Sequence, residues 1–348
     1  MPLLKAQDAW SKDWIRQQIA ALKEKGWYHS IELPDGQVLE GIQSISHLKK
    51  RLARFPVPAD LTGKRVLDIG AWDGWFSFEM ERRGAEVVAV DCVEMERFRL
   101  ARQLLNSNVD YRVLDVDELS PETVGRFDIV MFIGVLYHLR HPLQALERVC
   151  QLTREMALVE SFVIDEGLPK NGEPLRAVME FYETDELGGQ VDNWYGPNTA
   201  CLLGLCRAAG FARVKLEEVA EQRAHVTCYR HWEPPSEQPS YAPPVLTGAV
   251  NNRSLAPEFR KHKDEYVCCF FKSQEPGLRV EDVRPELDGY GAPVINIFGK
   301  GDGGWQANFR FPAGLKPGTH EVRLRTTHTG YSNSLPVELR PGLTSDWL

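Results

Sequence analysis

Between residues 64 and 164 the chain alternates five short apolar runs with amphipathic stretches, and this alternation restricts the fold more than any other feature. The apolar runs are RVLDIG, AEVVAVD, VDYRVLD, FDIVMFIG and EMALVESFVI. Helical spacing marks the segments 75–83, 95–106 and 142–150 between them. Near-continuous apolar strands that alternate with helices form a parallel sheet covered on both faces. We therefore predict an α/β fold of the Rossmann-like, doubly wound type.

Two predicted helices precede this alternation. Residues 6–25 carry tryptophan, isoleucine and leucine at helical spacing, with a polar opposite face. Residues 45–55 have the same character, and Pro56 and Pro58 end that helix. Between the two helices, ELPDGQVLEG contains the Asp-Gly signal of a hairpin turn. Residues 1–60 are thus expected to form an N-terminal helical or lid segment.

The chain after the alternation divides into a last part of the sheet and a second domain. A helix over 199–209 that ends at Gly210 is followed by the strand ARVKLEEV. A final strand, EYVCCFFKS, comes after a polar, proline-rich stretch, so the α/β domain is expected over 61–273. Beyond it lie the short runs PVINIFG, WQANFRF, HEVRLRT and LPVELR, separated by turn residues. This pattern predicts a small all-β sandwich over 279–348.

Composition narrows the class of protein. A chain of 348 residues is long enough for two domains. It has neither a basic segment followed by an apolar one at its start nor an apolar run of about 18 residues, so we expect a cytoplasmic protein without a membrane span. The seven cysteines form no CxxC pair, which favours reduced thiols over disulfides or a metal site. The net charge of -8 favours a small-molecule substrate over nucleic acid.

The strongest local signal is VLDIGAWDGWF, an apolar strand that ends in an acidic residue, a turn with two glycines and a helix start. Gly70 and Gly74 lack a Cβ and would let the backbone pass close to a nucleoside beyond the carboxyl end of the strand. Trp72 occupies the place of the middle glycine in a dinucleotide-binding loop. Asp68 and Asp73 would repel a diphosphate, whereas Asp68 suits the ammonium group of a methionine moiety. The loop therefore favours S-adenosylmethionine over a nicotinamide dinucleotide.

Two more acidic residues end the next two strands. Asp91 ends AEVVAVD, about 20 residues after Asp68, where a carboxylate accepts hydrogen bonds from ribose hydroxyls. Asp115 in RVLDVDEL is placed for the adenine amino group, and Val116 for packing on the ring. An aspartate at a strand end is also a common turn former or helix cap. Three of them at consecutive strand ends favour a cofactor site.

The motifs DIGAWDG, VAVD and LDVDEL resemble those of class I S-adenosylmethionine-dependent methyltransferases. This resemblance implies a seven-stranded sheet whose last strand is antiparallel, a place that EYVCCFFKS would take. It also implies S-adenosylmethionine as the cofactor.

A narrower resemblance runs over residues 38–272. LTGKRVLDIG, FDIVMFIGVLYHLRHPLQAL, LVESFVID and AEQRAHV are similar to the bacterial family that completes the 5-oxyacetyl modification of tRNA wobble uridine. That family transfers a carboxymethyl group and uses an upstream lysine and tryptophan. Here Glu40 takes the place of the lysine, and no tryptophan lies between Gly41 and Leu61. We therefore expect methyl transfer to a small-molecule O, N or S acceptor, with tRNA methyl or carboxymethyl transfer as the alternative. The basic run HLKKRLAR favours RNA, but such a run is also typical of a solvated helix face.

Residues that act on the acceptor are expected after the fourth strand. Methyl transfer needs the acceptor close and in line, and often a base that removes its proton. In GVLYHLRH, Gly134 is a candidate cofactor contact, and Tyr137 matches a cofactor-side tyrosine of the resembling family. His138 is the candidate base because imidazole exchanges protons near neutrality. The alternative is a structural histidine bonded to a backbone carbonyl, and His141 is expected to start a helix.

A polar and aromatic insert, RAVMEFYETDELGGQVDNWYGPN, follows the fifth strand. It is expected to form an acceptor pocket or lid, with Gly188 and Gly189 as a hinge. The alternative is a packed loop whose aromatic side chains fill the core. The candidate acceptor-binding residues are Glu180, Tyr182, Asn193, Trp194, Tyr195 and, after the sixth strand, Arg223.

No metal is expected, because the spacing of His138, His141 and Glu160 fits no standard ligand set. The C-terminal sequence GWQANFRFPAGLKPGTHEVRLRT resembles immunoglobulin-like modules of bacterial proteins. The resemblance implies a role in binding or in forming a homo-oligomer.

Overall fold

The computed structural model describes residues 26–165, 176–260 and 265–341. The chain divides into two compact units, Met1–Val116 and Asp117–Leu348. The helix predicted over residues 6–25 lies outside the described residues. Within the described ranges, no helix combines the length and the apolar character needed to cross a membrane.

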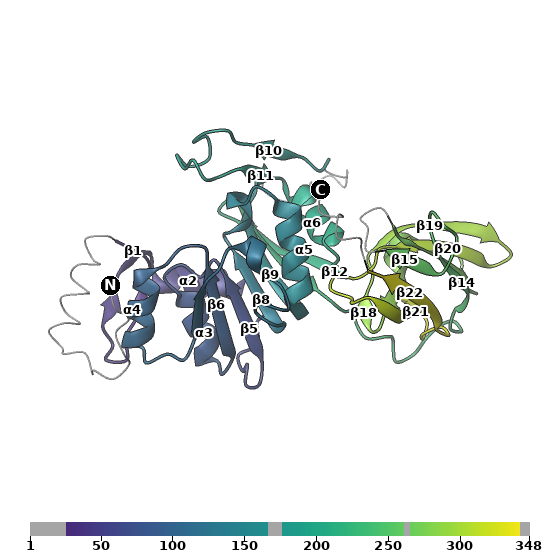
Figure 1. The fold of residues 1–348 in the computed structure, drawn as a ribbon, viewed down its shortest axis with the longest axis horizontal. Helices are drawn as coiled ribbons and strands as arrows, with labels where there is room; N and C mark the ends of the chain where they lie inside the picture. Colours follow the sequence, from purple (N-terminus) through teal and green to yellow (C-terminus); the bar gives the residue numbers. More distant parts are fainter. Residues whose placement is uncertain (1–25, 166–175, 261–264, 342–348) are drawn as a thin grey trace. The chain divides into compact units, whose positions relative to one another are not determined.

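Three parallel strands and two helices form the centre of the first unit (Figure 1). These are β5 (Arg65–Ile69), α3 (Trp75–Arg82), β6 (Glu86–Asp91), α4 (Glu96–Leu104) and β7 (Asp110–Val113). β6 pairs with β5 on one side and with β7 on the other. The interiors of β5 and β6 are almost fully buried, as expected for parallel strands with both faces covered. All five elements were predicted from the alternation of apolar runs.

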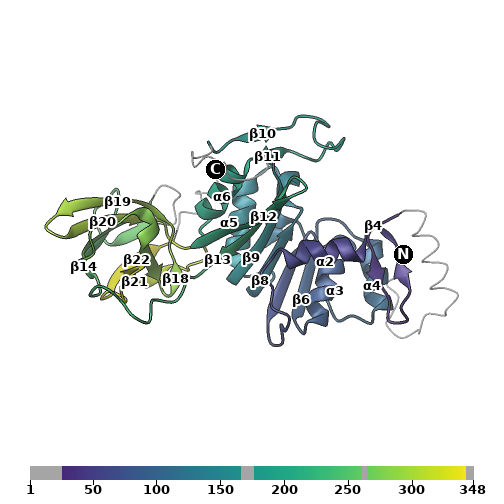
Figure 2. The same ribbon diagram turned by 180° about the vertical axis from the view of Figure 1, so that it is seen from behind.

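The described N-terminal residues contain four short strands besides a helix. β2 (Ile31–Glu32) and β3 (Val38–Leu39) form the predicted hairpin. β1 (Trp27–His29) pairs in parallel with β4 (Gly41–Gln43), which was not predicted. At Gly41 a Cβ atom would lie 2.6 Å from the backbone of His29, so close chain approach requires glycine there. The predicted helix is present as α2 (Ile45–Ala53), with Ser44 as its N-cap (Figure 2).

The second unit begins with the other strands of the α/β sheet. β8 (Phe127–Ile133) runs parallel to β9 (Thr153–Phe162), and β13 (Arg223–Tyr229) is antiparallel both to β9 and to β12 (Arg213–Ala220). The helices are α5 (Pro142–Leu152) and α6 (Thr199–Ala208). The hydrogen-bonding pattern gives one mixed sheet with the order β12-β13-β9-β8-β5-β6-β7. The predicted Rossmann-like α/β class is therefore confirmed.

The prediction that EYVCCFFKS is the last strand of this sheet is wrong. That segment forms β16 (Val267–Lys272), which pairs with β14 (Val245–Asn251) and β20 (Gly304–Phe309) of the C-terminal domain. The strand antiparallel to β9 is β13. A tight turn at Glu221 and Gln222, both with φ of 56°, joins β13 to β12. An apolar strand fits either core, so its partners and not its composition decide where it lies.

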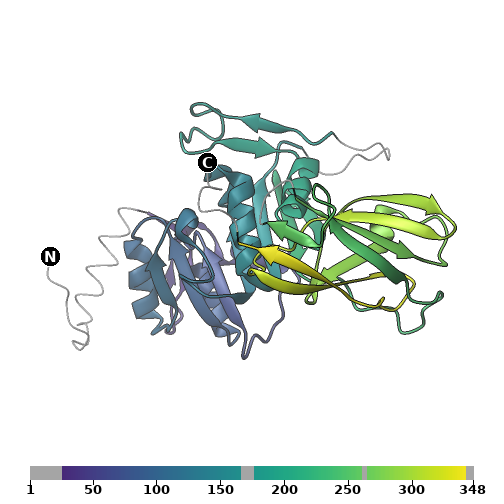
Figure 3. The same ribbon diagram turned by 45° about the vertical axis from the view of Figure 1, so that its right-hand side comes forward.

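The C-terminal domain consists of two sheets that share one hydrophobic core (green to yellow in Figure 3). One sheet has the order β14-β16-β20-β19, with β19 at Val294–Gly301. The other has the order β15-β22-β21-β17-β18. Its strands are β15 (Glu258–Arg260), β17 (Val283–Leu287), β18 (Tyr290–Gly291), β21 (Gly318–Thr326) and β22 (Leu335–Arg340). Because β14, β15 and β16 precede the expected start at residue 279, we propose a domain boundary between β13 and β14.

Three small elements complete the region that follows β8. The 3-10 turn η2 (Leu136–His138) lies directly after β8. Strands β10 (Met179–Phe181) and β11 (Tyr195–Pro197) form an antiparallel hairpin, which is the scaffold of the predicted insert. The loop between these two strands carries Gly188 and Gly189, both with positive φ.

Candidate active site

The loop after β5 is tied to the end of β6. The amides of Gly70 and Ala71 donate to the carbonyl of Val90, at 2.9 and 3.1 Å. Trp72 has a left-handed backbone with φ of 52°, and its amide donates to Asp91 Oδ2 at 3.0 Å. These bonds hold a conformation that is uncommon for a residue with a side chain.

Asp68, the acidic residue that ends β5, is buried and accepts a 2.6 Å hydrogen bond from Ser77 Oγ. Burial raises the pKa of its carboxyl group to about 7, the bonds from Ser77 oppose this rise, and the nearby charge of Asp91 adds to it. Among the described residues, no cationic side chain pairs with Asp68, and a bound ammonium group would supply a cation for the ionised carboxylate.

Asp73 has a structural role that differs from the one predicted. Its buried carboxylate accepts the amides of Tyr28 and His29, at 2.6 and 3.1 Å, and pairs with Arg97 Nε at 2.8 Å. The charge of Asp73 is therefore compensated within the first unit, and the repulsion of a diphosphate expected from it is not supported. Asp73 instead connects β1 and α4 to the loop.

Gly74 is required for packing against two rings. Its φ is 91°, and a Cβ atom there would lie 2.6 Å from the ring of Phe98 and 2.7 Å from that of Phe78. Phe98 in turn stacks on Tyr111 with ring centroids 4.2 Å apart. The sequence correctly pointed to a glycine requirement, but the close neighbours seen here are these rings.

Asp91 is the second buried carboxylate of this region. Besides the Trp72 amide, it accepts the amide of Val93 at 3.4 Å. Burial raises the pKa of Asp91 despite the backbone hydrogen bonds that lower it. Its orientation is therefore set by the backbone before any ligand binds.

Apolar side chains lie exposed at the ends of the same strands. Trp72, Val93 and Val113 are 40%, 50% and 40% exposed. Asp115, after β7, is exposed, and Val116 is buried at the start of η1 (Val116–Glu118). Exposed apolar surface beside a carboxylate suits a nucleoside, whose base is flat and whose ribose is polar. Asp68, Trp72, Asp91, Asp115 and Val116 are called the nucleoside half-site below.

In the second unit, Gly134 directly follows β8 with φ of 77°, and its amide donates to the carbonyl of Glu160 at 3.1 Å. The hydroxyl of the buried Tyr137 accepts a 3.0 Å bond from Arg223. Arg223 also pairs with the buried carboxylate of Glu160 at 3.1 Å, and His225 Nε2 lies 3.6 Å from its other oxygen. The sequence-predicted Tyr137 and Arg223 are thus in direct contact.

His138 contacts the insert. Its Nδ1 lies 3.4 Å from both the carbonyl oxygen and the Oδ2 atom of Asp192, and its side chain is 32% exposed. Burial lowers the pKa of His138, the Asp192 carboxylate opposes this, and Arg223 adds to it. This direction favours the neutral imidazole, which is the form that a base requires. The carbonyl contact also matches the structural alternative for this histidine.

Two further contacts join the insert to the segment after β8. The amide of Trp194 donates to the carbonyl of Tyr137 at 2.8 Å, and the Tyr195 hydroxyl donates to the carbonyl of Arg140 at 3.3 Å. The guanidinium of Arg140 lies 4.0 Å from the centroid of the Trp194 ring, a cation–π contact. Phe181 lies near Trp194 and Tyr195 and is 60% exposed.

The other predicted insert residues bond within the insert. Tyr182 is buried and donates to Glu180 Oε2 at 3.0 Å, and burial together with Glu180 raises the pKa of Tyr182 to about 12. Asn193 is 3% exposed and donates to the carbonyl of Leu187 at 2.7 Å. The Oδ1 atom of Asn193 has no hydrogen-bond partner among the described residues.

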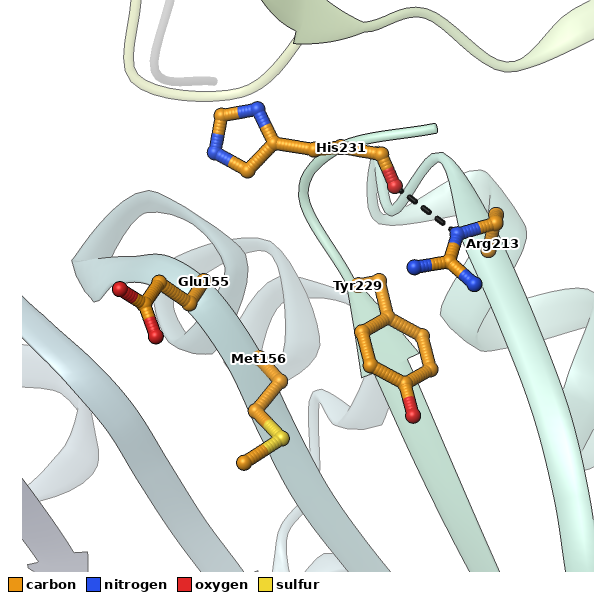
Figure 4. Close-up of a pocket in the computed structure, with 5 residues that line it drawn as sticks. All are labelled: Glu155, Met156, Arg213, Tyr229 and His231. Atoms are coloured by element: carbon orange, nitrogen blue, oxygen red, sulfur yellow. Dashed lines mark hydrogen bonds between the residues drawn. The ribbon is translucent and has the colours of Figure 1, made fainter. Parts of the chain in front are cut away.

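A pocket of about 220 Å³ lies elsewhere in the second unit (Figure 4). It is lined by Glu155, Met156, Arg213, Tyr229 and His231. Arg213 Nε donates to the carbonyl of His231 at 2.9 Å. Glu155 and Met156 stand near the amino end of β9, whereas open α/β sheets bind ligands beyond the carboxyl ends. None of the sequence-predicted site residues lines this pocket.

The comparison with protein families decides the class. The family model for a methyltransferase domain matches residues 41–216, just over half of the chain. The chain belongs to the methyltransferase-domain family. This membership confirms the predicted class of enzyme and its S-adenosylmethionine cofactor.

Two curated relatives are similar over part of this methyltransferase. The ubiquinone biosynthesis O-methyltransferase of Acinetobacter baylyi is 37% identical over 94 residues, 26% of this chain and 39% of the relative. The protein with the same name from Xanthomonas oryzae pv. oryzae is 41% identical over 102 residues, 29% of this chain and 42% of the relative. The chain thus matches about two fifths of the length of these relatives.

Among solved structures, the N-terminal domain of EvdMO1 with SAH (S-adenosylhomocysteine) bound is 21% identical, with a TM-score of 0.46. The similarity covers 64% of this methyltransferase and 98% of that domain. The narrower resemblances, to the tRNA-modifying family and to immunoglobulin-like modules, stay predictions.

Three residues that contact the predicted site residues were missed from the sequence. Ser77 lies in the first turns of α3, where a hydroxyl nine residues after Asp68 reaches back to it. Arg97 pairs with Asp73, and Asp192 contacts His138. Each of these contacts joins segments that are far apart in the sequence. Of these three contacts, only that of Asp68 with Ser77 could have been predicted from residues close together in the sequence.

Among the described residues, no group of three or more potential metal ligands lies close together.

Proposed function

We propose that this methyltransferase transfers the methyl group of S-adenosylmethionine to a hydroxyl oxygen of a small aromatic acceptor. The observation that carries the proposal is the set of carboxylates at the ends of three consecutive strands, two of them buried and fixed by hydrogen bonds. The exposed apolar side chains beside them complete a surface for a nucleoside.

The nucleoside half-site supplies one group for each part of the cofactor. Asp68, whose pKa burial raises, takes the ammonium group, because that cation restores the charge balance of the buried carboxylate. Asp91 accepts hydrogen bonds from the ribose hydroxyls, and the Trp72 amide already orients its carboxylate. Asp115 accepts the adenine amino group, and Val116 packs on the ring. The bound cofactor supplies an electrophilic methyl group on its sulfonium sulfur.

The acceptor half-site is defined as Tyr137, His138, Asp192, Trp194 and Arg223. Neutral His138 takes the proton of the acceptor hydroxyl. Trp194, with Phe181 and Tyr195 beside it, offers a partly exposed aromatic surface on which a flat ring stacks. The names of the two O-methyltransferase relatives support oxygen as the accepting atom, and the net charge of -8 supports a small molecule rather than RNA.

The β-sandwich is proposed to bind a partner or to join copies of the chain. Its resemblance to immunoglobulin-like modules and its position outside the matched methyltransferase region support this role.

The experiment is methyl transfer by the full chain from methyl-labelled S-adenosylmethionine to a panel of catechols, non-aromatic alcohols, amines, thiols and unmodified tRNA. We expect label in the ether of a catechol and formation of S-adenosylhomocysteine. Label in tRNA would contradict the proposed acceptor class, and label in an amine or a thiol would contradict oxygen as the accepting atom. Failure of the protein to bind S-adenosylmethionine would contradict the whole proposal.

A further inference from the structure

The surroundings of His138 fix which ring nitrogen carries hydrogen. Among the residues that the structure describes, the two groups nearest Nδ1 are oxygens of Asp192, one carbonyl and one carboxylate, each at 3.4 Å. Neither oxygen has a hydrogen to donate, so Nδ1 must be the protonated nitrogen of the neutral ring. Nε2 then holds the free electron pair. Among the described residues, Nε2 has no hydrogen-bond partner.

We propose that Asp192 is a positioning residue that holds His138 in the Nδ1–H tautomer and leaves Nε2 as the proton acceptor for the substrate hydroxyl. This inference rests on the proposed function. The hydroxyl proton passes to Nε2, the O–H electron pair stays on oxygen, and the imidazolium later releases a proton to water. A carboxylate that orients a histidine in this way is a recurring arrangement of proton-transfer sites.

The contact depends on the insert being held in place by the two residues that follow Asp192. Directly after it, the side chain of Asn193 donates to the carbonyl of Leu187 at 2.7 Å and to Gln190 Oε1 at 3.3 Å. The next residue, Trp194, donates its amide to the carbonyl of Tyr137, the neighbour of His138. The distance of 3.4 Å to Asp192 is long for a hydrogen bond, as is common at catalytic groups before the substrate binds.

Two charged groups act on His138, from two different elements. Asp192 of the insert raises its pKa, whereas Arg223 at the start of β13 lowers it. The ring of Tyr137, a further titratable group, has its centroid 4.4 Å from that of the His138 ring. Loss of the Asp192 charge therefore lowers the pKa of His138 further. Its tautomer preference and its pKa should change together.

The test is nuclear magnetic resonance of the full chain with ¹⁵N-labelled histidine rings, in the absence of substrate. His138→Gln assigns the His138 signals among the nine histidines. Asp192→Asn replaces an acceptor-only carboxylate with an amide that also donates, and Asp192→Glu restores the carboxylate. Asp185→Asn is the matched control, because Asp185 is an exposed carboxylate of the same insert whose side chain accepts a hydrogen bond from Thr184.

We expect the Nδ1–H tautomer in the wild type, in Asp192→Glu and in Asp185→Asn. In Asp192→Asn we expect the Nε2–H tautomer to gain population and the pKa of His138 to fall. A wild-type ring in the Nε2–H form would overturn the inference, even if neither Asp192 variant folds. So would an Asp192→Asn spectrum and titration identical to those of the wild type. Calorimetry with S-adenosylmethionine on the same samples reports on the proposed function separately, because that binding does not depend on the tautomer.

Discussion

The nucleoside half-site and the acceptor half-site are built in different ways. In the first, the key carboxylates of Asp68 and Asp91 are buried, and hydrogen bonds from neighbouring strand ends and α3 fix their positions. In the second, His138 is partly exposed and Asp192 is exposed, and they approach each other where a turn meets a hairpin loop. Asp68 and Asp91 are part of the core of their unit, whereas the contact between His138 and Asp192 depends on a loop that is anchored by a few contacts.

This difference matches what each half has to recognise. Groups that are oriented before binding suit a cofactor that never changes, because little conformational entropy is then lost when it binds. Acceptors differ between methyltransferases, and loops tolerate the sequence changes that new acceptors require. Substitutions in the nucleoside half-site should therefore change folding or cofactor affinity. Substitutions in the acceptor half-site should change turnover alone.

The largest effect is expected at the proposed base. His138→Gln should lower kcat for methyl transfer to a catechol by roughly 10²- to 10⁴-fold, the usual contribution of a general base. Binding of S-adenosylhomocysteine, measured by calorimetry, should not change. His141→Gln is the control, because His141 only precedes α5. If His138→Gln keeps the turnover of the wild type, His138 is not the base that takes the proton of the hydroxyl.

Gly74→Ala should reduce the free energy of unfolding by about 2–4 kcal/mol. The left-handed backbone costs about 1 kcal/mol with a Cβ atom, and the overlap with the Phe98 ring adds about 1–3 kcal/mol. Gly63→Ala is the matched control, since Gly63 also has a positive φ but no atom within 4 Å of a Cβ, so about 1 kcal/mol is expected. Denaturant unfolding measures both. Equal reductions in the free energy of unfolding for the two variants would show that the Phe98 and Phe78 rings move aside at little cost.

The pKa of Asp68 makes cofactor affinity depend on pH. Since the pKa is raised to about 7, the carboxyl is mostly neutral at pH 6 and ionised at pH 8, and affinity for S-adenosylmethionine should rise about tenfold between them. The same shift predicts that this group stabilises the free fold below its unfolded pKa. That contribution is lost as pH rises towards 7. Asp68→Asn should weaken binding and reduce its pH dependence, whereas Asp110→Asn, at the start of β7, should keep it.

The smallest effect is expected on the basic helix. Lys49 and Lys50 of α2 are exposed, whereas Arg51 is buried and donates to Gln43 Oε1 at 2.7 Å. The double change Lys49→Ala/Lys50→Ala should leave S-adenosylmethionine binding and catechol turnover as in the wild type. Arg51 is left unchanged, because its replacement would disturb the fold of the first unit. A large loss of turnover in the double variant would instead assign this helix a part in acceptor binding.

The sequence was informative where the determinants are local. Strand ends, the turn after β5 and the three carboxylates follow from residues close together in the chain, and the structure has them at the predicted strand ends. The partners of Asp73 come from β1 and α4, so its compensation by Arg97 could not be read from the loop. The contact of His138 with Asp192 joins residues 54 positions apart for the same reason. The prediction placed the strand β16 in the wrong sheet, because its run of apolar residues suits either core.

The most direct test of the central claim is calorimetric titration with S-adenosylhomocysteine. The full chain and its Asp91→Ala variant are compared. We predict that the wild type binds and that Asp91→Ala binds roughly 100-fold more weakly, since two hydrogen bonds to a charged group are lost. Asp110→Ala, an exposed aspartate at the other end of the neighbouring strand, should bind as the wild type does. Absence of binding to the wild type, or equal binding to Asp91→Ala, would contradict the assignment of the cofactor to these strand ends.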